Sequence, residues 1–203
     1  MEKFARLDAF LNARIDEIYP EPNDAIHDHV VPQMFERLCS NYGLSPGHRV
    51  LDVGCGQGYA LEKFRGLGAE PVGLTFGEDY QVCRSKGFEV HEMDQSFLDF
   101  DSESFDLVWC RHCLEHSIFP YFTLSEFFRV LKPGAVLYVE VPAPDTISAH
   151  QSNPNHYSVL GKSMWRELLN RAGFEEGEDL DVNFQLVIGP DTYWSFFRTR
   201  PKN

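Results

Sequence analysis

One stretch of the sequence decides the fold: Val50-Leu51-Asp52-Val53-Gly54-Cys55-Gly56-Gln57-Gly58-Tyr59. Its first half is an apolar run entered through Arg49, which predicts a β-strand buried on both faces. The three glycines that follow allow the backbone to turn sharply and to approach a ligand closely. A helix is expected from Tyr59, and its first N–H groups would point at that ligand. The stretch therefore predicts a strand, a ligand-binding turn and a helix in succession.

Strands and helices alternate along the rest of the chain. The expected strands cover about residues 49–53, 71–75, 88–91, 105–110, 135–141, 174–182 and 193–200, and the expected helices between them about 59–67, 78–86, 121–131 and 162–172. This alternation predicts a doubly wound α/β fold, with a mostly parallel seven-stranded sheet between two layers of helices. The last two strands could pair as a hairpin and place an antiparallel strand at the edge. In such sheets the ligand lies at the carboxyl ends of the strands.

Length and composition fit one globular domain. The chain has 203 residues, of which 43% are hydrophobic and 24% are charged. No apolar run is long enough to cross a membrane, and the first residues lack the apolar core of a signal peptide, so we expect a cytoplasmic protein without a membrane partner. The net charge of −13 repels phosphate backbones, which argues against a nucleic-acid partner.

Further segments follow the glycine turn in the order that is typical of one family. They are Phe105-Asp106-Leu107-Val108-Trp109-Cys110 with Leu114-Glu115-His116, then Leu131-Lys132-Pro133-Gly134, then His156-Tyr157-Ser158 ahead of Ala172-Gly173-Phe174. Together with Asp52-x-Gly54-x-Gly56-x-Gly58 they resemble class I S-adenosylmethionine-dependent methyltransferases, over about residues 32–200. The resemblance implies a Rossmann-like core, S-adenosyl-L-methionine as cofactor, and transfer of its methyl group to a small-molecule acceptor.

Two helices are expected before the first strand. Apolar residues at spacings of three and four, from Phe4 to Ile18, predict the first helix, and Pro20 ends it. The second is expected from about Pro32 to Tyr42. We therefore expect a single methyltransferase domain over residues 1–203, with an N-terminal helical cap over residues 1–45 and the Rossmann-like core over residues 46–203.

The resemblance also implies which residues bind the cofactor. They lie on the glycine turn and near the ends of the second, third and fourth strands: Asp52, Gly54, Cys55, Gly56, Thr75, Asp94, Gln95, Cys110 and Arg111. Asp94 matches the acid that in this family commonly contacts adenine. Thr75 stands where an acid often binds the ribose, and a threonine offers only a hydroxyl. Further candidates for the ribose contact are Glu78, Asp79 and Tyr80.

Histidines gather where an acceptor would bind. His112 and His116 follow the fourth strand, and His150 and His156 follow the fifth. Transfer to a hydroxyl or an amine requires a base, and an imidazole can accept a proton at neutral pH. We therefore expect the catalytic residues to be His116, His112 and Glu115, and the acceptor atom to be oxygen or nitrogen. Leu114-Glu115-His116 also resembles the corresponding stretch of ubiquinone-biosynthesis-type O-methyltransferases.

Several other interpretations of these motifs are open. A nicotinamide-binding protein would have Gly-x-Gly-x-x-Gly, but here the third glycine comes one residue early. The segment from His112 to His116 spells the inverted zinc-protease motif, yet it starts at a buried strand end. We expect no resident metal; a divalent ion that orients the substrate is an alternative. The chain could also be a cofactor-binding module of this fold without catalysis, acting as a subunit or regulator.

Overall fold

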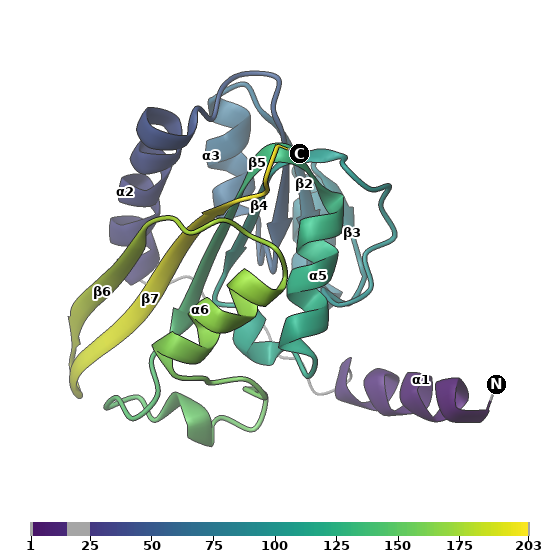
Figure 1. Cartoon of the computed structure of the whole chain (residues 1–203), viewed down its shortest axis with the longest axis vertical. Coiled ribbons are helices and arrows are strands. Elements are labelled where there is room, and N and C mark those ends of the chain that lie inside the picture. Colours follow the sequence, from purple (N-terminus) through teal and green to yellow (C-terminus); the bar gives the residue numbers. More distant parts are fainter. Residues whose placement is uncertain (1, 16–24, 203) are drawn as a thin grey trace.

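The computed structural model describes residues 2–15 and 25–202, and a seven-stranded sheet forms its centre (Figure 1). The strands are β1 (Arg49–Val53), β2 (Glu70–Leu74), β3 (Glu89–His91), β4 (Phe105–Arg111), β5 (Leu131–Pro142), β6 (Asp179–Leu186) and β7 (Gly189–Thr199). The helices are α1 (Glu2–Ile15), α2 (Ala25–Tyr42), α3 (Tyr59–Gly66), α4 (Gly77–Ser85), α5 (Pro120–Val130) and α6 (Lys162–Arg171), with two short 3₁₀ turns, η1 (Leu114–His116) and η2 (His150–Ser152).

The strand order confirms the predicted mixed α/β sheet. The strands lie side by side in the order β3-β2-β1-β4-β5-β7-β6. The first five strands along the chain are parallel, and β7 runs antiparallel to both of its neighbours. The chain winds outward from β1 to β3 and then returns to place β4 on the other side of β1. A sheet of this kind opens a crevice at the carboxyl ends of the two strands where the winding reverses.

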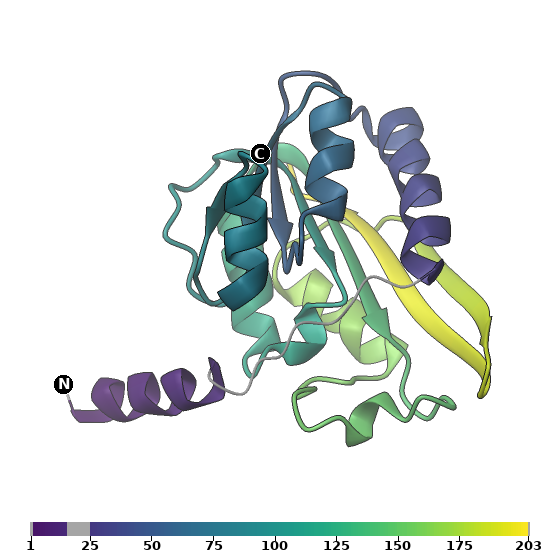
Figure 2. The ribbon, with the colours of Figure 1, turned by 180° about the vertical axis from the view of Figure 1, so that it is seen from behind.

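Helices cover both faces of the sheet, and each face has its own apolar cluster. Figures 1 and 2 show α5 and α6 on one face and α2, α3 and α4 on the other. On the second face the rings of Phe35 and Phe64 meet Trp109 edge to face, with centroids 5.3 and 5.8 Å apart. Such contacts between fully buried rings join α2 and α3 to the middle of β4.

The second helix begins earlier than its sequence predicts. It starts at Ala25, and Pro32 lies inside it with an exposed side chain. A proline within a helix removes one hydrogen bond, but the buried residues Val31, Met34 and Phe35 hold α2 on the sheet. The first helix lies apart from both layers (Figures 1 and 2), and residues 16–24 lie outside the described part of the chain. The helical cap over residues 1–45 therefore stays a prediction.

The fifth strand also begins early, at Leu131 instead of Ala135. Its pairing with β4 is irregular between Phe105 and Leu107, so Lys132-Pro133-Gly134 forms a distortion within the strand instead of a separate turn.

No described helix combines the length and the apolar character that a membrane span requires.

Candidate active site

The turn after β1 depends on glycine at two positions for different reasons. Gly54 and Gly56 both adopt left-handed backbone, with φ of 74° and 49°. A Cβ on Gly54 would lie 2.7 Å from the sulfur of Cys113, so packing requires this glycine. A Cβ on Gly56 would meet only Oδ2 of Asp79, at 3.9 Å, among the described residues. Gly56 therefore borders open space in which a ligand can approach the backbone.

Asp52 holds a buried carboxylate at the carboxyl end of β1. The residue is 2% exposed, and its Oδ2 has no hydrogen-bond donor among the described residues. Burial raises the pKa of this carboxyl well above its usual range, Cys83 raises it further, and the positive charge of Arg111 opposes the rise. A ligand with a positively charged amino group, which the expected cofactor carries, would supply the missing donor. The orphaned oxygen and the open space at Gly56 fit such a ligand.

Asp79 is the candidate ribose partner that the structure brings to the glycine turn. Glu78 is exposed, whereas Asp79 is buried in the first turn of α4, and its Oδ1 has no hydrogen-bond partner among the described residues. Thr75 is buried at the end of β2, where its N–H donates to the carbonyl of His91 at 3.2 Å. The sequence offered three candidates here, and helix geometry decides between Glu78 and Asp79 because adjacent residues of a helix point in different directions.

The residues after β3 form a turn that is hydrogen-bonded to the segment after β4. Oδ1 of Asp94 accepts a hydrogen bond from the N–H of Ser96 at 2.7 Å, which fixes the turn. Gln95 donates to the carbonyl of Cys113 at 2.9 Å, while its Oε1 is buried without a partner among the described residues. One carboxylate oxygen of Asp94 thus bonds within the turn, and the other oxygen would make the adenine contact that is expected from the sequence.

Three other predicted cofactor residues use their side chains elsewhere. Cys55 packs in an apolar cluster with Cys83, and a hydrogen bond that its thiol donates to Cys83, together with burial, raises the pKa of the Cys55 thiol. Cys110 is fully buried in the core, where burial raises its pKa. Arg111 points its guanidinium at Glu140, with Nε 2.7 Å from Oε1. A cofactor in the crevice would therefore meet the backbone of these residues.

Glu140 is the centre of a buried polar network that joins the ends of β4, β5 and β7. Its carboxylate pairs with Arg111 and with Nε2 of His112 at 2.8 Å, and it accepts hydrogen bonds from Tyr138 at 2.6 Å and Ser195 at 2.9 Å. Burial acts to raise the pKa of this carboxyl, but the positive charges and hydrogen bonds outweigh it and hold the pKa at about 2. Glu140 therefore stays ionised and fixes His112, which has a strained φ of 51°.

A polar cavity of about 430 Å³ lies next to this network, at the carboxyl edge of the sheet. It is lined by His112, Glu115, Ser148, Ala149, His150, Ser152, Asn153, His156 and Tyr193. The ring of His112 stacks on Tyr193 with centroids 4.1 Å apart. Nε2 of His150 lies 3.2 Å from Oδ2 of Asp191, a second buried carboxylate. The structure thus brings three of the four expected histidines, His112, His150 and His156, to a single cavity.

His116 does not line this cavity itself but lies beside His156, which does. Nδ1 of His116 lies 2.9 Å from the backbone carbonyl of Asn155, which can only accept, so Nδ1 is the donor and Nε2 carries the lone pair in the neutral ring. The rings of His116 and His156 meet edge to face with centroids 4.8 Å apart. Burial, followed by the neighbouring rings of His116 and His150, lowers the pKa of His156 to about 4, and the backbone of His150 opposes this weakly.

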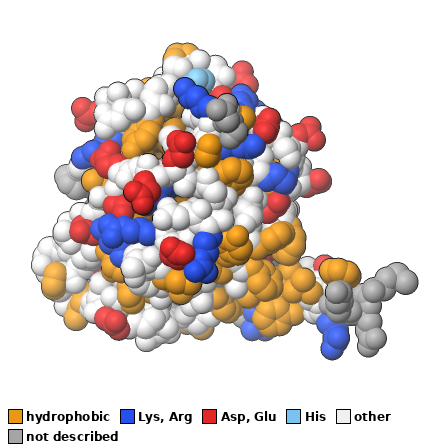
Figure 3. All heavy atoms as spheres, in the orientation of Figure 1, with side chains coloured by type: hydrophobic (Ala, Val, Ile, Leu, Met, Phe, Trp, Pro, Cys, Tyr) orange, Lys and Arg blue, Asp and Glu red, His pale blue; other side chains and the backbone are white. Residues whose placement is uncertain are grey.

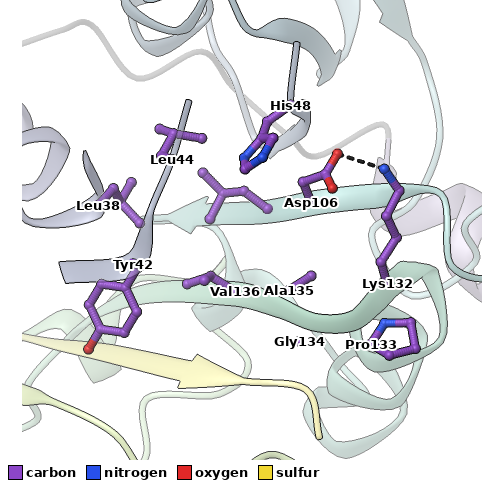
Figure 4. A pocket seen from close by; sticks show the side chains of 11 residues that line it. Leu38, Tyr42, Leu44, His48, Asp106, Lys132, Pro133, Gly134, Ala135 and Val136 are labelled. Atoms are coloured by element: carbon purple, nitrogen blue, oxygen red, sulfur yellow. Dashed lines mark hydrogen bonds and ion pairs between the residues drawn. The ribbon is translucent and has the colours of Figure 1, made fainter. Parts of the chain in front are cut away.

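A smaller cavity of about 160 Å³ lies at the opposite, amino edge of the sheet (Figure 4). Side chains of α2 and the first residues of β4 and β5 line it, and Lys132 pairs with Asp106 at 2.7 Å. None of the expected site residues borders it. This edge carries no group that would contact the glycine turn, so the carboxyl edge is the candidate active site.

Comparison with known proteins identifies the family of the chain. The family model described as "Methyltransferase domain" matches residues 16–176. A sterol 24-C-methyltransferase of Yarrowia lipolytica is 40% identical over 175 residues, which cover 76% of this chain and 45% of the relative. A ubiquinone biosynthesis O-methyltransferase of Hahella chejuensis is 39% identical over 140 residues, covering 64% of this chain and 56% of the relative. The chain therefore spans about half the length of these curated relatives.

Solved structures share the fold at low sequence identity. A putative sarcosine dimethylglycine methyltransferase from Galdieria sulphuraria has a TM-score of 0.74 at 16% identity, covering 91% of this chain and 92% of its own. The [4+2]-cyclase SpnF has a TM-score of 0.71 at 21% identity, covering 86% and 83%. Because one neighbour is named for a cyclisation, the fold alone does not determine the reaction.

Gly56→Val tests the placement of the cofactor. The new side chain would enter the open space at the glycine turn, so we expect calorimetry to show loss of measurable S-adenosylmethionine binding. Gly43→Val is the matched control, because Gly43 also has a left-handed φ, of 69°, and nothing lies within 4 Å of its Cβ position among the described residues. The assignment fails if Gly56→Val binds the cofactor as the unmodified chain does, or if both variants lose binding equally.

The lowered pKa of His156 predicts a pH-dependent stability. Between about pH 6.5 and pH 4 the unfolded chain binds a proton at His156 that the folded chain does not bind. The free energy of unfolding should therefore be full above pH 6.5 and decrease as the pH falls towards 4. Urea unfolding across this range should show a shallower dependence for His156→Gln than for His91→Gln. An NMR titration of His156 with a midpoint near 6.5 would contradict the account.

Proposed function

The chain belongs to the class I S-adenosylmethionine-dependent methyltransferases, and on that premise we propose that it transfers a methyl group to an oxygen or nitrogen atom of a polar small molecule. The observation that carries the proposal is the polar cavity at the carboxyl edge, which His112, His150 and His156 line. The glycine turn and Asp52 lie at the same edge of the sheet, after β1. Cofactor and acceptor would thus bind at neighbouring strand ends.

The cofactor side of the proposal rests on four residues. S-adenosylmethionine supplies a methyl group that is activated by the positive charge of its sulfur. In our proposal Asp52 binds the amino group of the cofactor, Gly56 admits it close to the backbone, Asp79 binds the ribose hydroxyls and Asp94 binds the adenine amino group. Asp52 and Asp79 each have a buried oxygen without a hydrogen-bond partner among the described residues. These contacts would position the methyl group and contribute little else, because the methyl group is already activated.

The acceptor side requires a group that receives a proton. The acceptor oxygen or nitrogen forms a bond to the methyl carbon, while the carbon–sulfur bond breaks and its electron pair stays on sulfur. The proton of the acceptor then goes to Nε2 of His116, which holds the lone pair because Nδ1 donates to Asn155. His112 would orient the acceptor, since Glu140 and Tyr193 fix its ring on both sides. Glu115 completes the polar wall.

The lining of the cavity supports a polar acceptor over a sterol. Apart from Ala149 every lining side chain carries a polar atom, and five of the nine lining residues are histidine, asparagine or glutamate: His112, Glu115, His150, Asn153 and His156. An apolar acceptor in this cavity would leave these groups without hydrogen-bond partners, which is costly. The sterol methyltransferase of Yarrowia lipolytica therefore shares the domain, and we assign this chain a different class of acceptor.

A cofactor-binding module without catalysis is the second candidate. Figure 3 shows hydrophobic side chains gathered near one end of α5, and Phe97, Tyr121 and Phe122 are each more than 40% exposed. A surface of this kind can be covered by another protein. Acidic and basic side chains are interspersed on the same face, and the net charge of −13 disfavours nucleic acid as the partner.

His116→Ala tests the proposed reaction. With labelled S-adenosylmethionine and a panel of small hydroxyl and amine acceptors, turnover should fall by about 10²–10⁴-fold, the usual contribution of a general base. Cofactor affinity by calorimetry should not change, and His48→Ala at the amino edge should keep full turnover. Full turnover in His116→Ala would contradict the role of His116. Normal cofactor binding without transfer to any acceptor would favour the module without catalysis.

A further inference from the structure

We infer that Glu115, His116 and His156 form a binding site for one divalent first-row transition-metal ion in the wall of the acceptor cavity. One ligand atom from each of the three side chains lies within 4.8 Å of the other two. The inference that the ion binds depends only on the positions of these three residues. Its role in the reaction rests on the proposed function.

The three residues come from two segments that the fold ties together. Glu115 and His116 lie on η1, directly after β4, and His156 lies in the connection that follows β5. The N–H of Ser158 donates to the carbonyl of Glu115 at 2.9 Å, and its hydroxyl donates to the carbonyl of Ser117 at 2.7 Å. Ser158 itself is buried. The relative position of the ligands is therefore set by the backbone and not by flexible side chains meeting at a surface.

The types of ligand indicate which ions fit. Two imidazoles and one carboxylate suit Zn²⁺, Fe²⁺, Co²⁺ and related ions, whereas Mg²⁺ and Ca²⁺ prefer oxygen ligands throughout. Bonds of about 2.0–2.2 Å place the ligands of one ion roughly 3–3.5 Å apart, so ligand atoms that now lie within 4.8 Å of one another would close by at most about 1.3–1.8 Å. A change of this size needs only small side-chain rotations. Three protein ligands leave further coordination positions open.

Residues around the cluster orient one of its imidazoles as metal sites require. Histidines that bind a metal almost always donate their other N–H to a carbonyl or a carboxylate. His116 donates through Nδ1 to the carbonyl of Asn155, and the N–H of Asn155 in turn donates to Oδ1 of Asn153 at 3.0 Å. Asn155 is buried. The side chain of Asn153 also contacts Nε2 of His156 at 3.2 Å, so one short segment supports both histidines.

The other two histidines of the cavity are paired with carboxylates outside this cluster, although the ring of His150 stacks on that of His156 with centroids 5.8 Å apart. His112 is paired with Glu140, and His150 is paired with Asp191. In each pair a buried carboxylate holds the histidine ring in place. They provide the control for the test, because His150 lies in the same cavity but outside the proposed ligand set.

An ion at this site would act on the acceptor directly. Glu115 and His156 line the cavity, so the open coordination positions can face a molecule bound there. An acceptor hydroxyl that binds the ion becomes more acidic, and its proton would leave to water in the cavity. The oxygen then forms the bond to the methyl carbon as the carbon–sulfur bond breaks. With the ion bound, His116 is a metal ligand and water takes the proton, whereas without the ion His116 is the base.

The test measures metal binding without cofactor or acceptor. We expect calorimetry with ZnCl₂ against a competing chelator to give one site per chain, and the Co²⁺ form to show an absorption spectrum without thiolate charge transfer. Glu115→Gln, His116→Gln and His156→Gln should each weaken binding by at least about tenfold, since even loss of an outer partner costs about 10–100-fold. His150→Gln should bind as the unmodified chain does. Circular dichroism identifies which variants are folded.

Two results would overturn the site. The first is Zn²⁺ affinity that is the same in all folded variants of the three ligands, which means adventitious binding elsewhere. The second is an affinity that falls equally in His150→Gln. The role in the reaction is tested separately: chelator should abolish turnover and Zn²⁺ or Mn²⁺ should restore it. Full turnover in chelator would show that methyl transfer does not need the metal, and the proposed function would still hold. Zn²⁺ binding without transfer to any acceptor would support the metal site and contradict the proposed function.

Discussion

The ion pair between Glu140 and Arg111 is the interaction on which both halves of the site depend. A fully buried carboxylate is tolerated only when it is paired and hydrogen-bonded, and Glu140 meets this requirement with Arg111, His112, Tyr138 and Ser195. The network joins the ends of β4, β5 and β7, so it sets the edge of the sheet where the chain leaves β4. It also holds His112 in a left-handed conformation that a non-glycine residue seldom adopts.

Asp52 shows what happens when a buried carboxylate lacks such partners. It lies on the same edge, and Arg111 reaches it only as a nearby positive charge while pairing with Glu140. One of its oxygens has no donor among the described residues, and burial raises its pKa. Glu140 is therefore satisfied within the fold, whereas Asp52 is incomplete until a cation arrives. This contrast explains why we assign Glu140 to structure and Asp52 to ligand binding, although both are buried acids.

The sequence predicted the order of strands and helices and the place of the site, because alternating patterns and the glycine turn are local signals. It did not predict the partners of Cys110 and Arg111. The pattern of apolar residues identifies the strand, but it does not show which side chains of other elements the strand contacts. It placed His112, His116, His150 and His156 at the carboxyl edge but could not give the contacts between their rings, because a connection of about twenty residues separates β5 from α6. The start of α2 before Pro32 was missed for a similar reason: tertiary packing outweighs a local helix-breaking signal.

We propose that the carboxyl edge binds S-adenosylmethionine through the buried charge of Asp52. The most direct test is calorimetry of the cofactor with the unmodified chain, Asp52→Asn and Asp106→Asn, across a range of pH. The account predicts tight binding that weakens as falling pH protonates Asp52, clearly weaker and pH-independent binding for Asp52→Asn, and unchanged binding for Asp106→Asn at the opposite edge. Equal affinity and equal pH dependence in all three proteins would contradict it.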